Sequence, residues 1–383
     1  MRVCLVYDCL FPYTVGGGER WYRNLAERLA AAGHDVTYLT LRQWEPGAQP
    51  QIPGVSVVAV GPRMALYVHG RRRIAPPLRF GAGVLAHLLR HGHRYDVVHC
   101  SSFPYFSLLA AALVRRLGGY ALVVDWLEVW SAEYWRSYLG RLGWIGIGVQ
   151  RRCARLRQHA FCLSELHAAR LREEGLRGEV TVLRGLLTGS LEREEPLPAE
   201  PLVVFAGRLI AEKNAPSVAA AVALAAERVP GLRGVIFGDG PERDAVLAQI
   251  ASLPDPAIVS APGFVEADTV REAIRRACCL LLPSRREGYG LVVVEAAAVG
   301  TPSILVRGPD NAAVELVEEG VNGVVVASAE PTELAAAIVA VFAAGPAFRA
   351  STSAWFASNR ERLSIERSLE AVLDVYGAVA ARA

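Results

Sequence analysis

The chain has 383 residues, more than a single hydrophobic core usually serves, so two domains are expected. Hydrophobic residues make up 52% and charged residues 21%, which excludes a disordered chain. The formal net charge of +3 is small for this length and gives no support to broad nucleic-acid binding.

The cysteines and the N-terminal residues point to a cytoplasmic protein. The seven cysteines are scattered, with no CxxC pair and no zinc-ligand spacing, so a disulfide scaffold and a metal site are both disfavoured. The first residues, MRVCLVYD, enter an apolar strand and carry an early acid, Asp8, which does not fit a secretion signal. No run approaches the roughly 18 uninterrupted apolar residues of a spanning helix, so we expect any membrane contact to be peripheral.

Short apolar runs alternate with longer amphipathic stretches, the pattern of repeated βα units that build a parallel sheet. One such stretch, residues 19–32, is predicted to be a helix that ends at Gly33, because glycine accepts a left-handed backbone. In the first half the predicted strands span residues 2–7, 35–40, 55–60, 96–100, 121–126 and 179–183. These elements predict a Rossmann-like domain over residues 1–190.

The alternation stops in the charged, proline-rich segment SLEREEPLPAEP, so residues 191–200 are predicted to be an exposed interdomain linker. Further strands are predicted over residues 202–206, 234–237, 279–283, 303–306 and 323–326. They outline a second Rossmann-like domain over residues 201–355, and residues 356–383 are predicted to be a helix that packs back on the first domain. Ligands of such sheets lie beyond the carboxyl ends of the strands, so functional residues are expected in the loops there.

A glycine run, Gly16, Gly17 and Gly18, lies between the first strand and the first helix. Small residues let the backbone approach a ligand closely. The run is not GxGxxG, and no acid ends the second strand to bind an NAD ribose, so an NAD-dependent oxidoreductase is disfavoured. A flexible turn is the alternative reading.

Aromatic and basic residues follow the predicted strand 121–126. Asp125, Glu128 and Trp130 are candidates for binding a sugar or another acceptor, although clustered tryptophans also occur in hydrophobic cores. Residues 136–157 combine arginines with tryptophan and isoleucine, as a helix on an anionic membrane surface does. A solvated helix face is the alternative.

The only lysine of the chain, Lys213, lies in the segment FAGRLIAEKN after the predicted strand 202–206. The same loop carries Gly207 and Arg208. Fixed cations stabilise negative charge that develops on a departing anion, so Arg208 and Lys213 are candidate catalytic residues. An ordinary surface lysine is the alternative.

Two carboxylates bracket a predicted helix start in the segment EGYGLVVVE, which follows a buried strand. The first N–H groups of that helix, near Gly290 and Leu291, can bind a phosphate or a sugar oxygen. Glu287 and Glu295 can accept hydrogen bonds from sugar hydroxyls. A surface helix with an acidic first turn is the alternative.

These segments, with the run GPDNAAVELVEEGVNGVVV, resemble the retaining glycosyltransferases of the GT-B fold, family four. The resemblance covers most of the chain and implies an N-terminal acceptor domain facing a C-terminal donor domain across a cleft. It further implies metal-independent transfer of a hexose-type sugar from a UDP- or GDP-sugar to a glycan, lipid-linked or small-molecule acceptor, with the nucleotide sugar as co-substrate and no other cofactor.

The resemblance assigns roles to individual residues. It gives Arg208 and Lys213 to the donor diphosphate and Glu287 to the transferred sugar. The remaining donor-binding residues that it implies are Gly16, Gly17, Gly18, Gly207, Phe264, Gly288, Tyr289, Gly290, Leu291 and Glu295. Related sequences often have histidine where this chain has Leu127, so a histidine-assisted step is in doubt. An epimerase of the same fold and a non-catalytic nucleotide-sugar-binding subunit are the alternatives.

Overall fold

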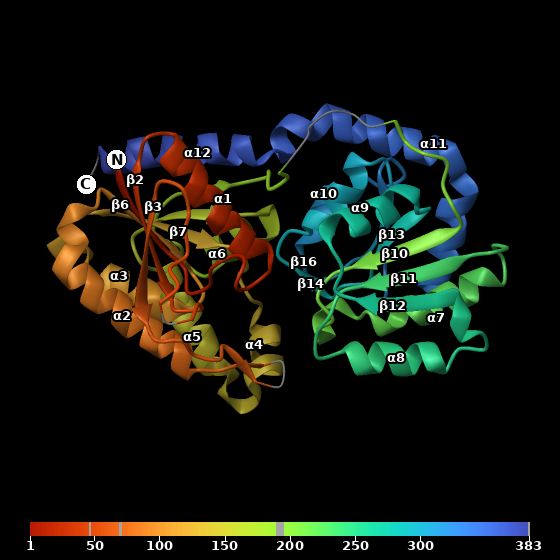
Figure 1. Ribbon diagram of the computed structural model, residues 1–383, viewed down its shortest axis with the longest axis horizontal. Helices are drawn as coiled ribbons and strands as arrows, with labels where there is room; N and C mark the ends of the chain where they lie inside the picture. Colours follow the sequence, from red (N-terminus) through yellow and green to blue (C-terminus); the bar gives the residue numbers. More distant parts are fainter. Residues whose placement is uncertain (46, 69–70, 189–194, 382–383) are drawn as a thin grey trace. The chain divides into compact units, whose positions relative to one another are not determined.

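The computed structural model describes residues 1–45, 47–68, 71–188 and 195–381, which form two units (Figure 1). Unit 1 comprises Met1–Leu186 and Glu366–Ala383, and unit 2 comprises Leu187–Ile365. Residues 191–194 of the predicted linker lie outside the described residues.

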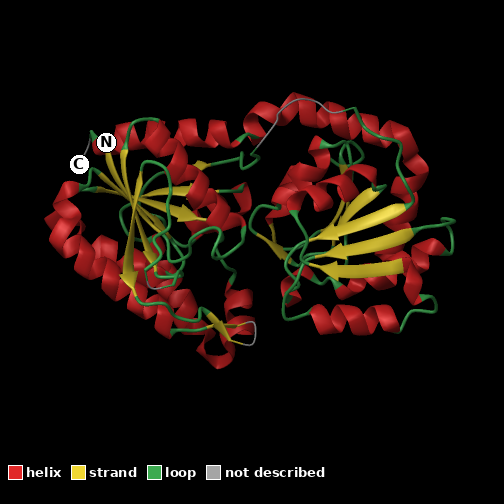
Figure 2. Cartoon of the chain, viewed as in Figure 1, coloured by secondary structure: helices red, strands yellow, loops and turns green. Residues whose placement is uncertain are grey.

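Unit 1 is built on a parallel sheet in the order β3-β2-β1-β6-β7-β8-β9. Its strands are β1 (Arg2–Val6), β2 (Asp35–Leu41), β3 (Val55–Gly61), β6 (Val97–Ser101), β7 (Ala121–Trp126), β8 (His159–Cys162) and β9 (Val180–Val182). β1, β6 and β7 are buried almost throughout, because helices cover both faces of the sheet, as Figure 2 shows. β8 was not predicted, because its four residues are too few to show a period.

Helices and short elements complete unit 1. They are α1 (Gly17–Ala31), α2 (Ala75–His91), α3 (Tyr105–Gly118), α4 (Ala132–Leu139), α5 (Gly143–Ala154), α6 (Glu165–Glu173), the 3₁₀ turns η1 (Gly92–Arg94) and η2 (Gly140–Leu142), and the antiparallel pair β4 (Tyr67–Val68) and β5 (Arg71–Arg72). As predicted, Gly33 follows α1 in a left-handed conformation, with φ 83°.

Unit 2 repeats the architecture with the strand order β12-β11-β10-β13-β15-β17. Its strands are β10 (Leu202–Ala206), β11 (Arg233–Phe237), β12 (Val259–Gly263), β13 (Cys279–Leu282), β15 (Ser303–Val306) and β17 (Gly323–Val326), and a separate parallel pair is β14 (Arg286–Glu287) with β16 (Asp310–Asn311). β12 was not predicted, because it contains Pro262. Proline is tolerated there because β12 is an edge strand.

The helical elements of unit 2 are α7 (Pro216–Ala226), α8 (Arg243–Ala251), α9 (Ala267–Arg276), α10 (Leu291–Ala298), α11 (Pro331–Leu363), η3 (Ala211–Lys213), η4 (Pro256–Ile258) and η5 (Ala312–Leu316). By length and composition alone α11 could cross a membrane, which the count of uninterrupted apolar residues did not predict. It contains a kink at Gly345, buries Leu334, Ile338 and Val341, and packs on α7. We therefore assign α11 to the core of unit 2.

The last helix, α12 (Ile365–Ala380), belongs to unit 1 from Glu366 onward. Its Tyr376 is fully buried, and the phenol oxygen lies 2.6 Å from Nδ1 of His99 on β6. Near the start of α12, Ser368 Oγ accepts a hydrogen bond from the Gly185 N–H at 3.1 Å. The C-terminal helix is therefore part of the core of unit 1.

Candidate functional site

Both sheets have the order of a doubly wound fold, which reverses once between two central strands. The reversal lies between β1 and β6 in unit 1 and between β10 and β13 in unit 2. Ligands of such sheets bind beyond the strand ends at this reversal. The glycine run follows β1, the Arg208–Lys213 loop follows β10, and the Glu287 loop follows β13. The predicted motifs therefore flank the reversal point of each sheet.

In unit 2, the loops after β10, β11 and β12 lie against one another. The Gly207 N–H donates to Phe237 O at 3.1 Å, and the Gly238 N–H donates to Gly263 O at 2.9 Å. Gly238 has φ 132°, and a Cβ atom there would lie 1.9 Å from Gly207 O. Only glycine permits this close approach, so these contacts give the three loops one backbone surface.

Lys213 and Glu287, which are 74 residues apart in the sequence, form an ion pair between Nζ and Oε1. Both side chains are largely buried, with exposed fractions of 18% and 7%. The Arg285 N–H donates to Glu212 O at 2.8 Å and so ties the two loops together. The only lysine of the chain thus lies at the reversal point, beside the carboxylate that the sequence analysis also selected.

Asn311, which the sequence analysis did not select, holds the Glu287 loop in place. Its buried side-chain amide donates to Ser284 O at 3.0 Å and to Val306 O at 2.8 Å, and its Oδ1 accepts from the Ala313 N–H at 3.1 Å. β16, which contains Asn311, pairs with β14 at Glu287. The signal available in the sequence was the polar pair Asp310-Asn311 inside the run GPDNAAVEL.

Arg286 adds a buried positive charge next to Glu287. Burial lowers its pKa from 12.5 to about 10, against the attraction of Glu287 and Asp310. Its Nη2 lies 3.5 Å from Glu212 Oε1. The guanidinium stays charged at neutral pH, so the loop around Glu287 carries balanced charges.

The start of α10 follows Glu287 of the Lys213–Glu287 ion pair by four residues. Gly290 precedes the helix with φ 93°, and none of the described side chains caps the first turn. The first N–H groups of the helix are therefore open to an anion or a hydroxyl. Gly288 and Tyr289 lead into the turn, and Tyr289 is buried. Glu295, just over one turn inside α10, is half-buried.

Two further predicted residues lie on exposed parts of unit 2. The Arg208 side chain is exposed and has no acidic partner within the described residues. Phe264, after β12, has 68% of its surface exposed. An exposed aromatic ring of this kind can pack against a ligand.

In unit 1 the glycine run forms the start of α1. A Cβ atom on Gly18 would lie 2.8 Å from Tyr7 Oη and 3.1 Å from Leu127 Cδ1, whereas a Cβ atom on Gly17 would meet nothing within 4 Å. Leu127, where related sequences often have histidine, therefore lies against this turn. The turn is tightly packed at Gly18 and open at Gly17.

Asp125 does not fit its predicted contact with an acceptor, and we correct that prediction. The residue is 1% exposed. Its Oδ2 accepts from Trp21 Nε1 at 2.7 Å, and its Oδ1 lies 2.9 Å from His99 Nε2. Both carboxylate oxygens therefore have partners in the core. Asp125 connects α1 to β6, and through His99 to Tyr376 of α12.

Glu128 and Trp130 instead lie on a half-buried aromatic wall. The Trp130 Nε1–H donates to Glu128 Oε2 at 2.8 Å. The Trp130 ring lies 5.5 Å from Phe103, 4.8 Å from Tyr134 and 5.3 Å from Tyr138 between centroids. Aromatic rings can stack on a sugar, and a carboxylate can accept hydrogen bonds from its hydroxyls, so the wall has the groups that bind carbohydrates.

Arg72 borders this wall. Its guanidinium pairs with the buried carboxylate of Asp8, and Cζ lies 5.0 Å from the ring centroid of Phe103. The pair fixes β5 against the loop after β1, so the cation–π contact belongs to a rigid edge of the wall.

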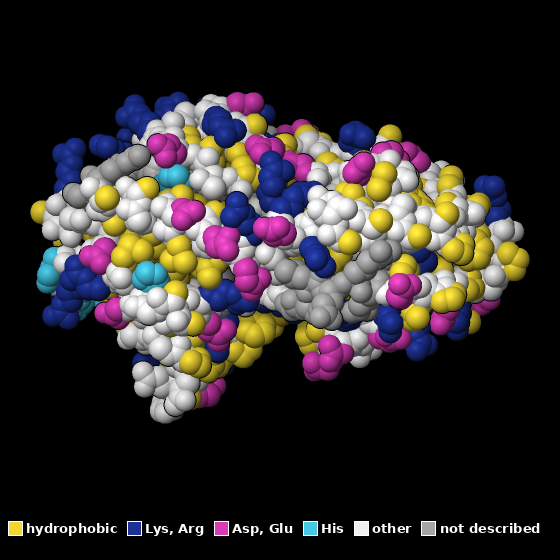
Figure 3. Space-filling model, turned by 90° about the horizontal axis from the view of Figure 1, so that it is seen from above, with side chains coloured by type: hydrophobic (Ala, Val, Ile, Leu, Met, Phe, Trp, Pro, Cys, Tyr) yellow, Lys and Arg dark blue, Asp and Glu magenta, His cyan; other side chains and the backbone are white. Residues whose placement is uncertain are grey.

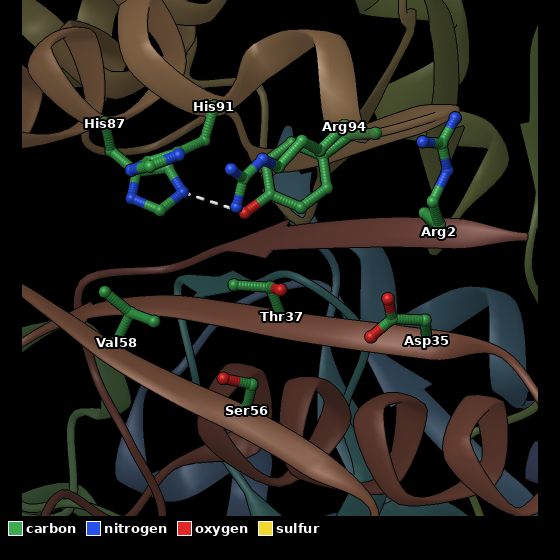
Figure 4. Close-up of a pocket in the computed structure, with 9 residues that line it drawn as sticks. Arg2, Asp35, Thr37, Ser56, Val58, His87, His91 and Arg94 are labelled. Atoms are coloured by element: carbon green, nitrogen blue, oxygen red, sulfur yellow. Dashed lines mark hydrogen bonds between the residues drawn. The ribbon is translucent and has the colours of Figure 1, made fainter.

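A different pocket, of about 400 Å³, lies at the amino ends of the unit 1 strands. Figure 4 shows His87, His91 and Arg94 on one side and Asp35, Thr37 and Ser56 on the other. None of the predicted site residues lines it. His87 Nε2 lies 2.8 Å from Tyr95 Oη. Burial, helped by the charge of His91, lowers the pKa of His87 from 6.5 to about 4.

This lowered pKa predicts a stability change in acid. Unfolded chains protonate the His87 imidazole near pH 6.5 and the folded chain only near pH 4, so its contribution is present above pH 6.5 and is lost as the pH falls towards 4. Because the ring is partly exposed, we expect about 1–2 kcal/mol. Calorimetry between pH 7.5 and 4.5 should show a weaker pH dependence for His87→Gln than for the exposed control His93→Gln. Identical slopes for the two variants would contradict this assignment.

Two doubly wound units in one chain, with the C-terminal helix returning to the first unit, define the GT-B class. Residues 16–185 match the family described as "Glycosyl transferase 4-like domain", and residues 191–350 match "Glycosyl transferases group 1". The chain therefore belongs to the group 1, family-four type of glycosyltransferases.

Curated relatives agree with this membership. A glycogen synthase of Mycobacterium tuberculosis is 27% identical, with 89% of this chain and 86% of the relative covered. A D-inositol 3-phosphate glycosyltransferase of Acidothermus cellulolyticus is 28% identical, over 94% of this chain and 85% of the relative.

Solved structures agree in fold. Sucrose-phosphate synthase from Thermosynechococcus elongatus has a TM-score of 0.81 at 18% identity, with both chains covered completely. HepE from Anabaena, solved in complex with UDP and glucose, has a TM-score of 0.73 at 18% identity, over 98% of this chain and 99% of that chain.

Proposed function

We propose that this glycosyltransferase moves a hexose-type sugar from a nucleotide-diphosphate sugar to an acceptor hydroxyl with retention of configuration. One observation carries the proposal: Lys213, Glu287 and the open start of α10 lie together at the reversal point of unit 2, with Arg208 on the adjoining loop. HepE was solved with UDP, which supports a UDP-sugar donor, with a GDP-sugar as the second candidate.

In this proposal, Arg208 and Lys213 bind the donor diphosphate, and the N–H groups at Gly290 and Leu291 contact a phosphate oxygen. Glu287 binds hydroxyls of the transferred sugar, and Glu295 binds the ribose. Phe264 lies beside the base, and Gly207 lets the backbone approach the phosphates. Gly288 and Tyr289 shape the turn that presents Glu287.

The chemical step follows from these roles. The bond between the anomeric carbon and the diphosphate oxygen breaks, and the acceptor oxygen forms its bond on the same face. The acceptor proton passes to an oxygen of the departing phosphate. Arg208 and Lys213 stabilise the charge of the leaving group, so the step as proposed requires neither a protein nucleophile nor a metal.

In this proposal, donor binding replaces the ion pair between Lys213 and Glu287. The ammonium and the carboxylate neutralise each other, and both side chains are largely buried. An arriving diphosphate offers the ammonium a stronger partner and leaves the carboxylate to accept hydrogen bonds from sugar hydroxyls. In this proposal, the diphosphate and the sugar hydroxyls replace the contact that Lys213 and Glu287 make with each other.

Unit 1 would supply the acceptor side. We propose that Glu128 and Trp130 contact the acceptor, and that Gly16, Gly17 and Gly18 contact the acceptor and the donor phosphate. The open Gly17 and the aromatic wall at Trp130 support this assignment. We further propose a cytoplasmic enzyme, because nucleotide sugars are the donors.

Nucleotide binding gives the first test. In a thermal-shift screen against UDP-, GDP-, ADP- and TDP-sugars, one donor should raise the melting temperature, since a ligand of the native state stabilises it. For that donor, Glu295→Ala should weaken binding on the order of tenfold by calorimetry, because a charge-assisted hydrogen bond to the ribose is lost. The control Glu318→Ala lies outside the proposed site. Equal affinities of wild type and Glu295→Ala would remove the ribose assignment.

A second test separates transfer from other chemistry. With the identified donor, slow hydrolysis is expected when no acceptor is present. When an acceptor is present, NMR of the glycoside formed by transfer should show the same anomeric configuration as the donor. Binding without any hydrolysis or transfer would instead identify a non-catalytic subunit. Release of an isomerised free sugar would identify an epimerase. Inversion in the product would overturn the retaining mechanism.

A further inference from the structure

One segment of unit 1 combines positive charge with exposed apolar side chains. Residues 134–164 contain six arginines, at positions 136, 141, 151, 152, 155 and 157, and no acidic residue. The whole chain has a net charge of only +3. On the face of the molecule that Figure 3 displays, acidic and basic side chains are interspersed. Residues 63–94 also contain seven arginines and no acidic residue, so the charge alone does not single out residues 134–164.

The structure sorts this segment into a packed side and an open side of α5. The packed side buries Gly146, Gln150 and Cys153. A Cβ atom on Gly146 would lie 2.2 Å from Cε3 of Trp135, so the glycine lets α4 pack closely on α5. The open side, together with η2, carries Arg141, Leu142, Trp144, Ile145, Arg151, Arg152 and Arg155.

The open side has an apolar end and a basic end. Leu142, Trp144 and Ile145 have exposed fractions of 57%, 69% and 42%. The arginines follow about two to three turns after Trp144 along the same face, at Arg151, Arg152 and Arg155. Among the six arginines, only Arg151 has an acidic partner within the part of the chain that the structure describes, Glu174 at 2.7 Å. Unit 1 therefore uses neither the apolar end nor most of the charge for its own packing.

We propose that this surface docks on a bilayer that contains anionic lipid, and that the acceptor of the transfer is carried by a membrane lipid. Tryptophan with aliphatic neighbours suits the boundary between headgroups and acyl chains, and arginines around it pair with lipid phosphates. A nucleic acid would match the charge but not the aliphatic Leu142 and Ile145. The chemistry of the face therefore favours a lipid surface.

The aromatic wall connects this surface to the proposed acceptor site. α4 carries Tyr134 and Tyr138, whose rings contact Trp130, and α4 packs directly on α5, as Figure 1 shows. Docking through α5 thus places the wall next to the membrane. The acceptor part of this inference rests on the proposed function, whereas the docking part does not.

Sedimentation with vesicles tests the docking. The full chain should bind vesicles of phosphatidylcholine with phosphatidylglycerol, bind phosphatidylcholine alone weakly, and be released by 0.5 M salt. At about 1 kcal/mol per arginine, Arg152→Gln/Arg155→Gln should weaken binding about 25-fold. Trp144→Ala should weaken it on the order of tenfold. The matched controls are Arg90→Gln/Arg94→Gln and Leu117→Ala, which alter exposed residues elsewhere in unit 1.

The outcomes separate the two parts. Equal binding of all variants, equal binding to both vesicle types, or preference for a single-stranded oligonucleotide would overturn the docking. Nucleotide binding measured without vesicles should be the same in wild type and Trp144→Ala. If neither protein binds any nucleotide sugar, the proposed function is wrong, but the docking is not affected. If transfer to a detergent-free lipid extract is not reduced in Trp144→Ala relative to Leu117→Ala, the lipid-carried acceptor is wrong.

Discussion

Replacing Lys213 by alanine is expected to lower kcat by about 10²–10³-fold, with a smaller loss of donor affinity. The ammonium would stabilise charge that grows on the diphosphate in the transition state, and loss of one such group costs about 3–4 kcal/mol. Steady-state transfer assays at saturating donor measure the effect. Lys213→Arg keeps the charge but changes its geometry, so partial recovery is expected.

An alternative cause of such a loss is the carboxylate that Lys213→Ala would leave alone. Glu287 is 7% exposed, and an uncompensated buried charge destabilises its surroundings. The double variant Lys213→Ala/Glu287→Gln removes both charges. If Lys213 serves the leaving group, the double variant stays as slow as the single one. Recovery of turnover in the double variant would show instead that Lys213 only balances Glu287.

Substitution of Gly238 by alanine should destabilise unit 2 by at least about 3 kcal/mol. The glycine has φ 132°, and the new methyl would meet Gly207 O at 1.9 Å, so the loops after β10 and β11 must separate. The loop after β10, which carries the proposed donor-binding residues Arg208 and Lys213, would be displaced. Scanning calorimetry should show a lower melting temperature, and nucleotide affinity should fall as well.

The matched control for this substitution is Gly231→Ala in the same unit. Gly231 also has a positive φ, 73°, but a Cβ atom there would come no closer than 4.0 Å to its surroundings. Only the backbone penalty of about 1 kcal/mol applies. If both variants melt at the same temperature, the close contact of the Gly207 and Gly238 loops is not present in solution.

Much of the fold was accessible from the sequence, because buried parallel strands appear as short apolar runs between amphipathic helices. β1, β2, β10 and β15 lie within a residue or two of their predicted bounds. β8 and β12 were missed for different reasons. β8 has four residues, and β12 is an edge strand with a proline, so neither shows the apolar run of a central strand.

The candidate site was accessible in part. The motifs around Arg208, Lys213 and Glu287 were recognisable because each lies in a loop directly after a predicted strand. Their pairing was not, because it depends on η3 and on the contact of β14 with β16, which join residues far apart in the sequence. Asn311 escaped notice for the same reason, since its partners are backbone carbonyls.

Asp125 shows the opposite error. An acid at the carboxyl end of a parallel strand is a good candidate for ligand binding, and the sequence alone offers no sign of its partners. Trp21 and His99 come from other elements, and together they enclose the carboxylate. Whether a polar residue at a strand end faces solvent or the core depends on what the neighbouring strand and helix present to it.

The return of α12 to the first sheet has a consequence for synthesis. During translation, the whole of unit 2 is synthesised before the helix that carries Tyr376. Until then His99 on the central strand β6 lacks its Tyr376 partner, although the sequence of unit 2 is already complete. We therefore expect the domain that is encoded first to finish assembling last, and a chain that stops short of α12 to need chaperones for a domain whose other residues are all present.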